Sequence, residues 1–263
     1  MITEAEVGAA RKWLAKRGVE AEEPTTLLAL RLGARGGARP PAYWAWFVVL
    51  AAALLLGDFV LVLLPVLLGV ARADRFTGSW VFPMCVSFVL LGWLPVRRAD
   101  RRAAVSLGGR RLDVPRPSWR ESMNGWYRAS VVITFGGGAV VAVALCVATS
   151  RWLWALTWLV LLALSAIVVA VVLNAVLRRP VIAEDDTSLR IDAVLRAEDP
   201  FVVMPALFAL PVLIDPVLSG WSFTPWLVGY VVLAFATLFI GRYVQYRHRK
   251  LPAGDYGTSV VAR

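Results

Sequence analysis

The chain has 263 residues, of which 59% are hydrophobic and 17% are charged, and its mean hydropathy is +0.67. A soluble domain of this length needs a more polar surface, so the composition excludes such a domain and indicates that several apolar runs face lipid. The formal net charge at pH 7 is +10, and its distribution along the chain bears on orientation in the membrane.

Residues 1–42 precede the first apolar run and predict two short helices. Thr3-Glu4-Ala5-Glu6 has the spacing of a capping box, and apolar residues follow at helical spacing up to a stop at Gly18. A second helix is expected from about Thr26. The first helix is amphipathic, with a narrow apolar face and four cations. It is therefore expected either to lie on anionic lipid or to pack against the cytoplasmic loops.

Six apolar runs follow, each long enough or nearly long enough for a bilayer core, which takes about 20 helical residues to cross. They cover about residues 43–67, 77–95, 129–149, 152–176, 201–218 and 225–244. The sequence therefore predicts an all-α fold, a six-transmembrane-helix bundle over residues 43–244 with small cytoplasmic elements. Residues 1–42 form a cytoplasmic N-terminal segment and residues 245–263 a cytoplasmic tail.

Lys and Arg residues are distributed unequally between the two sides of this bundle. Of the 28, 25 lie before the first run, after the last one, or in the two long loops at 97–128 and 178–200; the others are Arg72, Arg75 and Arg151. Because loops rich in Lys and Arg stay in the cytoplasm, both termini are expected to be cytoplasmic and the protein to lie in the plasma membrane.

The loop at 97–128 is predicted to hold a short β-hairpin. Residues 104–107 and 110–114 flank Gly108-Gly109, which is the pattern of a two-residue turn. The loop carries nine cations and three acids, a net charge of +6. Arginines beside a membrane serve topology and lipid headgroups first, so no nucleic-acid partner is expected.

The loop at 178–200 gathers six of the chain's 18 acidic residues between Glu184 and Asp199. A short acidic helix over about 187–198, capped by Asp186 or Thr187, is predicted there, since acids early in a helix suit its dipole. With four arginines the loop has a net charge of −2, opposite to that of the loop at 97–128. We therefore expect the acidic helix to dock on the basic hairpin; a cytoplasmic protein partner is the alternative.

The expected docking has a polar and an apolar part. Its polar candidates are Asp185, Asp186 and Asp192 on the acidic helix, with Arg110 and Arg111 on the hairpin. Because a single exposed ion pair contributes only about 0–1 kcal/mol, apolar side chains are also required. Those expected in the contact are Ile191, Val194 and Leu195 on the acidic helix, with Val105 and Leu107 on the hairpin.

Two stretches carry a resemblance to a protein family. Leu177–Pro200 reads LRRPVIAEDDTSLRIDAVLRAEDP and, together with Gly108-Gly109, resembles the loops of uncharacterised multi-pass membrane proteins of high-GC actinobacteria. This similarity covers about a fifth of the chain. It implies a membrane component of the kind found beside regulators or ABC transporters, and it carries over no catalytic residue.

Polar residues inside the apolar runs form a candidate intramembrane site: Asp58, Asn174 and Asp215. A charged Asp at mid-bilayer costs about 2.5–3.5 kcal/mol, so Asp58 is expected to face the bundle interior. It would serve there either in a proton or cation path or as a protonated acid in a structural hydrogen bond. Asp215 is expected to reach interfacial water, and Asn174 to bond between helices.

Common catalytic and nucleotide-binding motifs are absent from the sequence. We therefore expect no enzyme activity, catalytic residue, cofactor or metal site. The first hypothesis is an accessory or permease-like component that works with a cytoplasmic protein partner or as a homo-oligomer in the lipid bilayer. The alternatives are a self-contained small-solute or proton-coupled transporter that uses Asp58, and an intramembrane enzyme acting on lipid.

Overall fold

The computed structural model of the protein describes residues 2–36, 77–108, 118–247, 250–251 and 254–258, together with Ala45, Val48, Val49 and Ala52. Apart from those four single positions, the first predicted span, with Asp58, lies outside the described residues. Arg110 and Arg111, in the second half of the predicted hairpin, also lie outside them.

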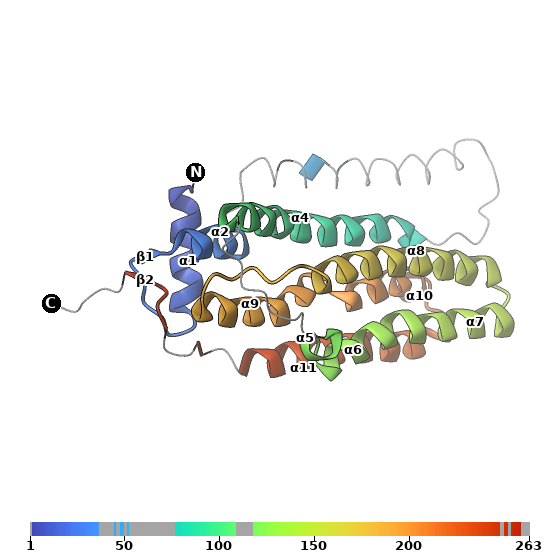
Figure 1. Ribbon diagram of the computed structural model, residues 1–263. Coiled ribbons are helices and arrows are strands. Elements are labelled where there is room, and N and C mark those ends of the chain that lie inside the picture. Colours follow the sequence, from blue (N-terminus) through green and yellow to red (C-terminus); the bar gives the residue numbers. More distant parts are fainter. Residues whose placement is uncertain are drawn as a thin grey trace.

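Long helices lie side by side, and short helices lie across one end of them (Figure 1). The long elements are α4 (Val81–Leu107), preceded by the 3-10 helix η1 (Thr77–Trp80), α8 (Trp152–Leu177) and α11 (Thr224–Arg247). A further long helix is built from α6 (Gly125–Val131), the π-helix η2 (Val132–Gly137) and α7 (Gly138–Ala148), with the short α5 (Trp119–Ser122) before it. Buried apolar side chains from these helices form one core.

Five helical stretches in the described part of the chain are long and apolar enough to cross a membrane. They are Val81–Leu107, Gly125–Ala148, Trp152–Leu177, Asp186–Ser219 and Thr224–Arg247. Each contains or largely overlaps one of the predicted spans. The predicted all-α fold is therefore confirmed. The five long apolar helices have the length and composition of the spans of a multi-pass membrane protein.

The predicted β-hairpin is wrong in its first half, because α4 continues to Leu107. Residues 104–107 are helical, and Pro95 is accommodated inside the same helix. Gly108 has a φ of +55°, and its N–H bonds to the Val105 carbonyl at 3.2 Å. A glycine in this left-handed conformation commonly ends a helix, so it marks the end of α4 and not a turn between strands.

The fifth stretch is irregular in its middle, between two α-helical ends. After α9 (Asp186–Glu198) it continues as the 3-10 helices η3 (Asp199–Val202) and η4 (Pro205–Leu213), then α10 (Ile214–Ser219). Proline lacks the N–H that an α-helix needs, and Pro205 and Pro211 both lie in η4. Half of its most apolar window is buried in the protein, the largest share among the five stretches.

Three short helices form a compact unit at one end of the bundle (Figure 1). They are α1 (Glu4–Ala15), α2 (Thr26–Arg35) and α9; an antiparallel pair of two-residue strands, β1 (Glu23–Pro24) and β2 (Gly257–Thr258), joins them. We call these elements the head. Its apolar core contains Trp13 and Leu14 of α1, Leu28 and Leu32 of α2, and Ile191 and Leu195 of α9.

The helix ends in the head largely follow the predictions. The capping box of α1 forms, with Glu6 N–H donating to Thr3 Oγ1 at 3.3 Å and Thr3 N–H donating to Glu6 Oε2 at 2.9 Å. Helix α2 begins at Thr26 as expected. The cap of α9 is Asp185, one residue before the predicted position, because its Oδ1 accepts the N–H of Ser188 at 2.7 Å.

Candidate functional site

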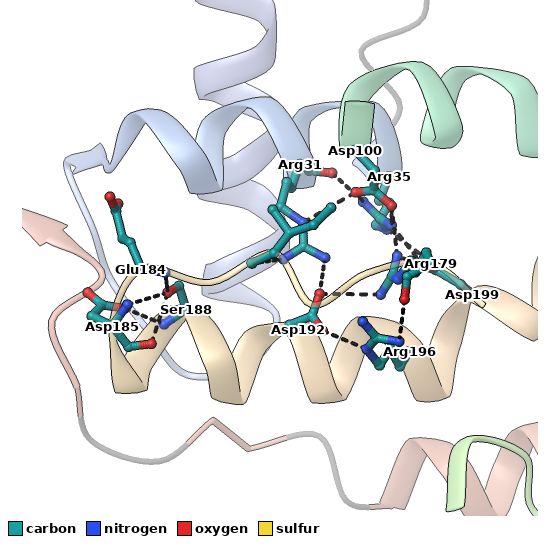
Figure 2. A network of polar contacts seen from close by, with 11 residues as sticks. Arg31, Arg35, Asp100, Arg179, Glu184, Asp185, Ser188, Asp192, Arg196 and Asp199 are labelled. Atoms are coloured by element: carbon teal, nitrogen blue, oxygen red, sulfur yellow. Dashed lines mark hydrogen bonds and ion pairs between the residues drawn. The ribbon is translucent and has the colours of Figure 1, made fainter. Parts of the chain in front are cut away.

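The most distinctive polar feature of the molecule is a buried ion network between the head and the long helices (Figure 2). It contains four arginines and three aspartates from separate parts of the chain. The members are Arg31 and Arg35 on α2, Asp100 on α4, Arg179 just after α8, Asp192 and Arg196 on α9, and Asp199 at the start of η3. Helix α2 contributes Arg31 and Arg35, and α9 contributes Asp192 and Arg196. In each helix the two residues are four positions apart, which places their side chains on one face.

Arg31 lies at the centre of this network, and its side chain is completely buried. Its Nη2 donates to Asp192 Oδ1 at 2.5 Å and its Nε to Asp100 Oδ1 at 3.2 Å. The Nη1 donates to the Ile182 carbonyl at 2.8 Å. One guanidinium therefore joins α2 to α4, to α9 and to the segment that precedes α9.

Arg35, one turn further along α2, binds two carboxylates at once. It donates to both oxygens of Asp199 at 2.8 Å and to both oxygens of Asp100 at 2.9 and 3.0 Å. Arg179 approaches the same two carboxylates from the end of α8, with Nη1 bonded to Asp100 at 2.7 Å and also to Asp199. Paired, two-pronged contacts of this kind are among the strongest hydrogen bonds in proteins.

The pKa values of the two arginines of α2 are shifted in opposite directions. Burial lowers the pKa of Arg31 below its ordinary value, against the attraction of Asp100 and Asp192. Burial would also lower the pKa of Arg35, but the attraction of Asp199 and Asp100 outweighs it and raises that pKa well above its ordinary value. Arginine stays charged in either case, so the network is a set of fixed charges.

Two further ion pairs lie at the edges of the network, one within the head and one between the head and α4. Arg17 after α1 donates from Nη2 to both oxygens of Glu198 on α9 at 2.5 and 2.6 Å. Arg102 on α4 donates to Glu6 on α1 at 2.5 Å. Burial would raise the pKa of Glu6, but hydrogen bonds from Thr3 and the contact with Arg102 lower it below its ordinary value.

Two pockets flank the network. One of about 280 Å³ lies between α4 and the end of α8. The other, of about 470 Å³, is lined by residues of α1, α4, η3 and α11. Asp199 and Val96 contribute to the walls of both, so the network separates the two pockets.

The predicted docking residues of the acidic helix are placed differently from the expectation. Ile191 packs against α1 and α2 in the core of the head, whereas Leu107 packs against Leu27, Leu30 and Ile182. Val105 is 81% exposed. The predicted apolar contact with the hairpin is therefore wrong, because the N-terminal helices occupy the apolar face of α9.

The acidic residues of α9 and its cap have separate roles. Asp192 is almost fully buried and bonds Arg31 and Arg196 at 2.5 and 2.6 Å. Asp185 caps α9, and Asp186 is exposed at its first turn. Contacts with Arg110 and Arg111 stay a prediction, because those arginines lie outside the described residues.

Of the candidate residues within the spans, the two that the structure describes, Asn174 and Asp215, do not join this network. Asp215 is buried in α10 and accepts a hydrogen bond from the Trp154 indole N–H at 2.7 Å. The expectation that it simply reaches interfacial water is therefore wrong. Asn174 on α8 is exposed, and its bond to another helix stays a prediction.

Sequence reasoning found Asp192 but missed the other members of the network. The i, i+4 spacing of Arg31 and Arg35 was a usable signal, since it places two cations on one face of a helix that also carries Leu28 and Leu32. Asp100, an acid within a basic stretch, was another. Neither signal identifies a partner, because the partners lie as far as 164 residues away along the chain.

The chemistry of this network suits a structural clamp, that is, a set of ion pairs that holds the head against α4 and the end of α8. Each of the three carboxylates accepts from at least two guanidinium groups or ion-pairs with them, which leaves them poorly suited to accept a proton or attack a substrate. Among the residues that the structure describes, no group of His, Cys, Asp and Glu is placed to hold a metal ion. No protein family, curated protein or solved structure was found to match this chain.

Proposed function

We propose that the chain is a non-enzymatic component of the plasma membrane, an accessory or permease-like subunit that works with a protein partner bound at its head. The observation that carries this proposal is the buried ion network, which attaches the head to α4 and to the end of α8. A partner that moves the head would displace these helices with it, because buried charges resist separation from their counter-ions.

Further support comes from the chemistry of the head and from its charge. Its buried carboxylates are engaged by arginines, so a coupling role accounts for them better than catalysis does. Lys and Arg are concentrated before the first apolar run, after the last one and in the two long loops. This distribution supports a cytoplasmic location for the head and for both termini. There a cytoplasmic subunit can reach the exposed first turn of α9, which carries Asp186.

The test is capture of partners by the tagged full chain from native membranes. We expect a cytoplasmic ATPase subunit or a similar soluble protein to co-purify, and Asp186→Lys to weaken its capture. Glu20→Lys, an equal change of charge at another exposed position, is the matched control. Recovery of the chain as a lone homo-oligomer would contradict the proposal and favour transport by the chain itself.

Orientation has its own test. Reporter fusions at residues 150 and 222 are expected to report the outside, and fusions at 20, 190 and 255 the cytoplasm, because 25 of the 28 Lys and Arg residues lie on one side. A cytoplasmic signal at residue 222 would mean that the stretch containing η4 and α10 does not cross the membrane.

A second function, a self-contained transporter, is favoured by the irregular fifth stretch. Non-helical backbone at membrane depth occurs where it is buried in protein or lines a cavity, and transporters bind substrates at interrupted helices. Residues 203–204 separate η3 from η4 within this stretch. Asp58→Cys, made in a chain without Cys85 and Cys146, would be labelled by a water-soluble thiol reagent if Asp58 lines a transport path. The absence of labelling in every state would contradict this second function.

A further inference from the structure

The pocket of about 280 Å³ between α4 and the end of α8 lies where both helices change from apolar to basic. Its floor is apolar, with Trp93, Val96 and Val176 all buried. Basic residues begin at Arg97 on α4 and at Arg178 after α8. In a membrane-spanning helix this change marks the level of the lipid headgroups.

Three arginines at this pocket carry charge that no acidic residue in the described ranges neutralises. Arg97, Arg101 and Arg178 line it and are exposed. Within the described part of the chain none of them forms an ion pair, although Arg97 lies over the Trp93 ring, 4.7 Å from its centroid. The two aspartates in the pocket wall, Asp100 and Asp199, are already held by Arg35 and Arg179.

A fourth arginine in the pocket wall, Arg179, belongs to the buried network. Its side chain is only 9% exposed. Its Nη1 bonds to Asp100, and its Nη2 lies 3.7 Å from Asp192 Oδ1. Because its Nε and Nη2 are buried, Arg179 adds positive charge behind the pocket wall, whereas the donors that a ligand can reach come from the three exposed arginines.

The larger pocket on the other side of the network differs in this respect. Two of its arginines, Arg17 and Arg35, are bound to Glu198, Asp100 and Asp199. Lys16 and Arg242 also line the larger pocket and form no ion pair within the described residues, but the smaller pocket has three such cations and an apolar floor beside them.

We propose that this pocket binds the phosphate group of an anionic phospholipid from the leaflet at the head end. Arginine forks match phosphate oxygens in geometry and charge, and the exposed Arg97, Arg101 and Arg178 line the space with such donors. The apolar floor beside Trp93 would contact the glycerol and the upper acyl chains. Basic pockets between helices at this level are a recognised way to bind anionic headgroups.

The test is native mass spectrometry of the detergent-solubilised full chain titrated with phosphatidylglycerol. Phosphatidylcholine, which has the same phosphate but no net charge, and inorganic phosphate are the comparison ligands. The test variant is Arg101→Gln/Arg178→Gln, and Arg98→Gln/Arg190→Gln is the control with the same loss of charge at exposed positions outside the pocket. None of these four arginines belongs to the buried network.

We expect phosphatidylglycerol to bind more tightly than phosphatidylcholine. The test variant should lower its affinity about 30-fold, from about 1 kcal/mol for each arginine near the membrane surface. The control variant should change the affinity less than about threefold. Equal losses in the two variants, or equal binding of the two lipids, would overturn the proposal. Displacement of the lipid by millimolar inorganic phosphate would assign the pocket to a free anion and overturn the lipid assignment.

Discussion

Asp192→Asn is expected to loosen the head from the long helices more than Arg31→Met does. The network contains four guanidinium groups and three carboxylates. Removing the Asp192 charge leaves four buried or nearly buried cations to share two anions. Removing Arg31 leaves three cations with three anions, and Asp192 keeps Arg196 at 2.6 Å.

The magnitudes follow from the burial of these groups. The Arg31, Asp192 and Arg196 side chains are 0%, 2% and 4% exposed, so solvent screens their interactions weakly. Loss of one partner from a buried ion pair costs about 3–5 kcal/mol, which we expect for Asp192→Asn. For Arg31→Met we expect about 2 kcal/mol, the value of a hydrogen bond to a charged group. Methionine fills a similar volume, and no unbalanced charge remains.

Hydrogen exchange of the full chain in detergent measures this difference at the level of each helix. A loss of about 3 kcal/mol raises the opening constant of α2 and α9 amides about 100-fold. Amides in the middle of α11 should exchange at the rate of the unsubstituted protein. The double variant Asp192→Asn/Arg31→Met should recover part of the loss, because it removes both partners of one contact.

The test is which of the two single variants accelerates hydrogen exchange in α2 and α9 more. If Arg31→Met accelerated exchange in α2 and α9 more than Asp192→Asn, then the main role of Asp192 would not be to balance the excess positive charge of the network, and the reasoning would be refuted. If neither variant changed exchange in these helices, the apolar core of the head would hold it without the network, and the clamp would be refuted.

Three other perturbations test the head and the bundle. Gly33→Ala is expected to lower stability by about 1–3 kcal/mol in thermal unfolding, because a Cβ there would lie 2.8 Å from Glu6 Cβ; Gly8→Ala, which meets open space, should not lower it. Folding lowers the pKa of Glu6, so its contribution is present above its ordinary pKa of 4.5 and is lost as pH falls below that value. Exchange of α1 amides should therefore accelerate beyond the intrinsic trend between about pH 6 and about pH 3, and Glu6→Gln should abolish that acceleration. Trp154→Phe removes the 2.7 Å bond to Asp215 and should cost about 1–3 kcal/mol; an unchanged unfolding temperature would show that this bond contributes nothing.

The positions of the long apolar helices could be predicted from the sequence because hydrophobicity is a local property. Each of the five described stretches contains or largely overlaps a predicted apolar run, since a bilayer core requires about 20 apolar residues in succession. The capping box at Thr3 and the helix after Asp185 were also readable, because a cap involves residues three or four apart.

Local signals failed where one pattern serves two structures. Gly108-Gly109 suits a hairpin turn, and Gly108 in a left-handed conformation equally suits the end of a helix. The preceding side chains decided between them: Ala103 and Leu107 are buried against α2 and the segment before α9, which keeps α4 helical to its end. This packing involves residues distant in the chain, so the tertiary structure alone determined it.

The partner of the acidic helix was decided in the same way. Opposite net charges pointed to the nearest basic loop, but charge complementarity does not specify geometry. Burial does, because a desolvated carboxylate such as Asp192 is tolerated only where donors converge on it. Those donors come from Arg31 and Arg196, on two different helices. The sequence by itself determined how much of the chain is apolar helix, and the tertiary structure decided which charges meet, because only the folded chain brings Arg31 of α2 to Asp192 of α9.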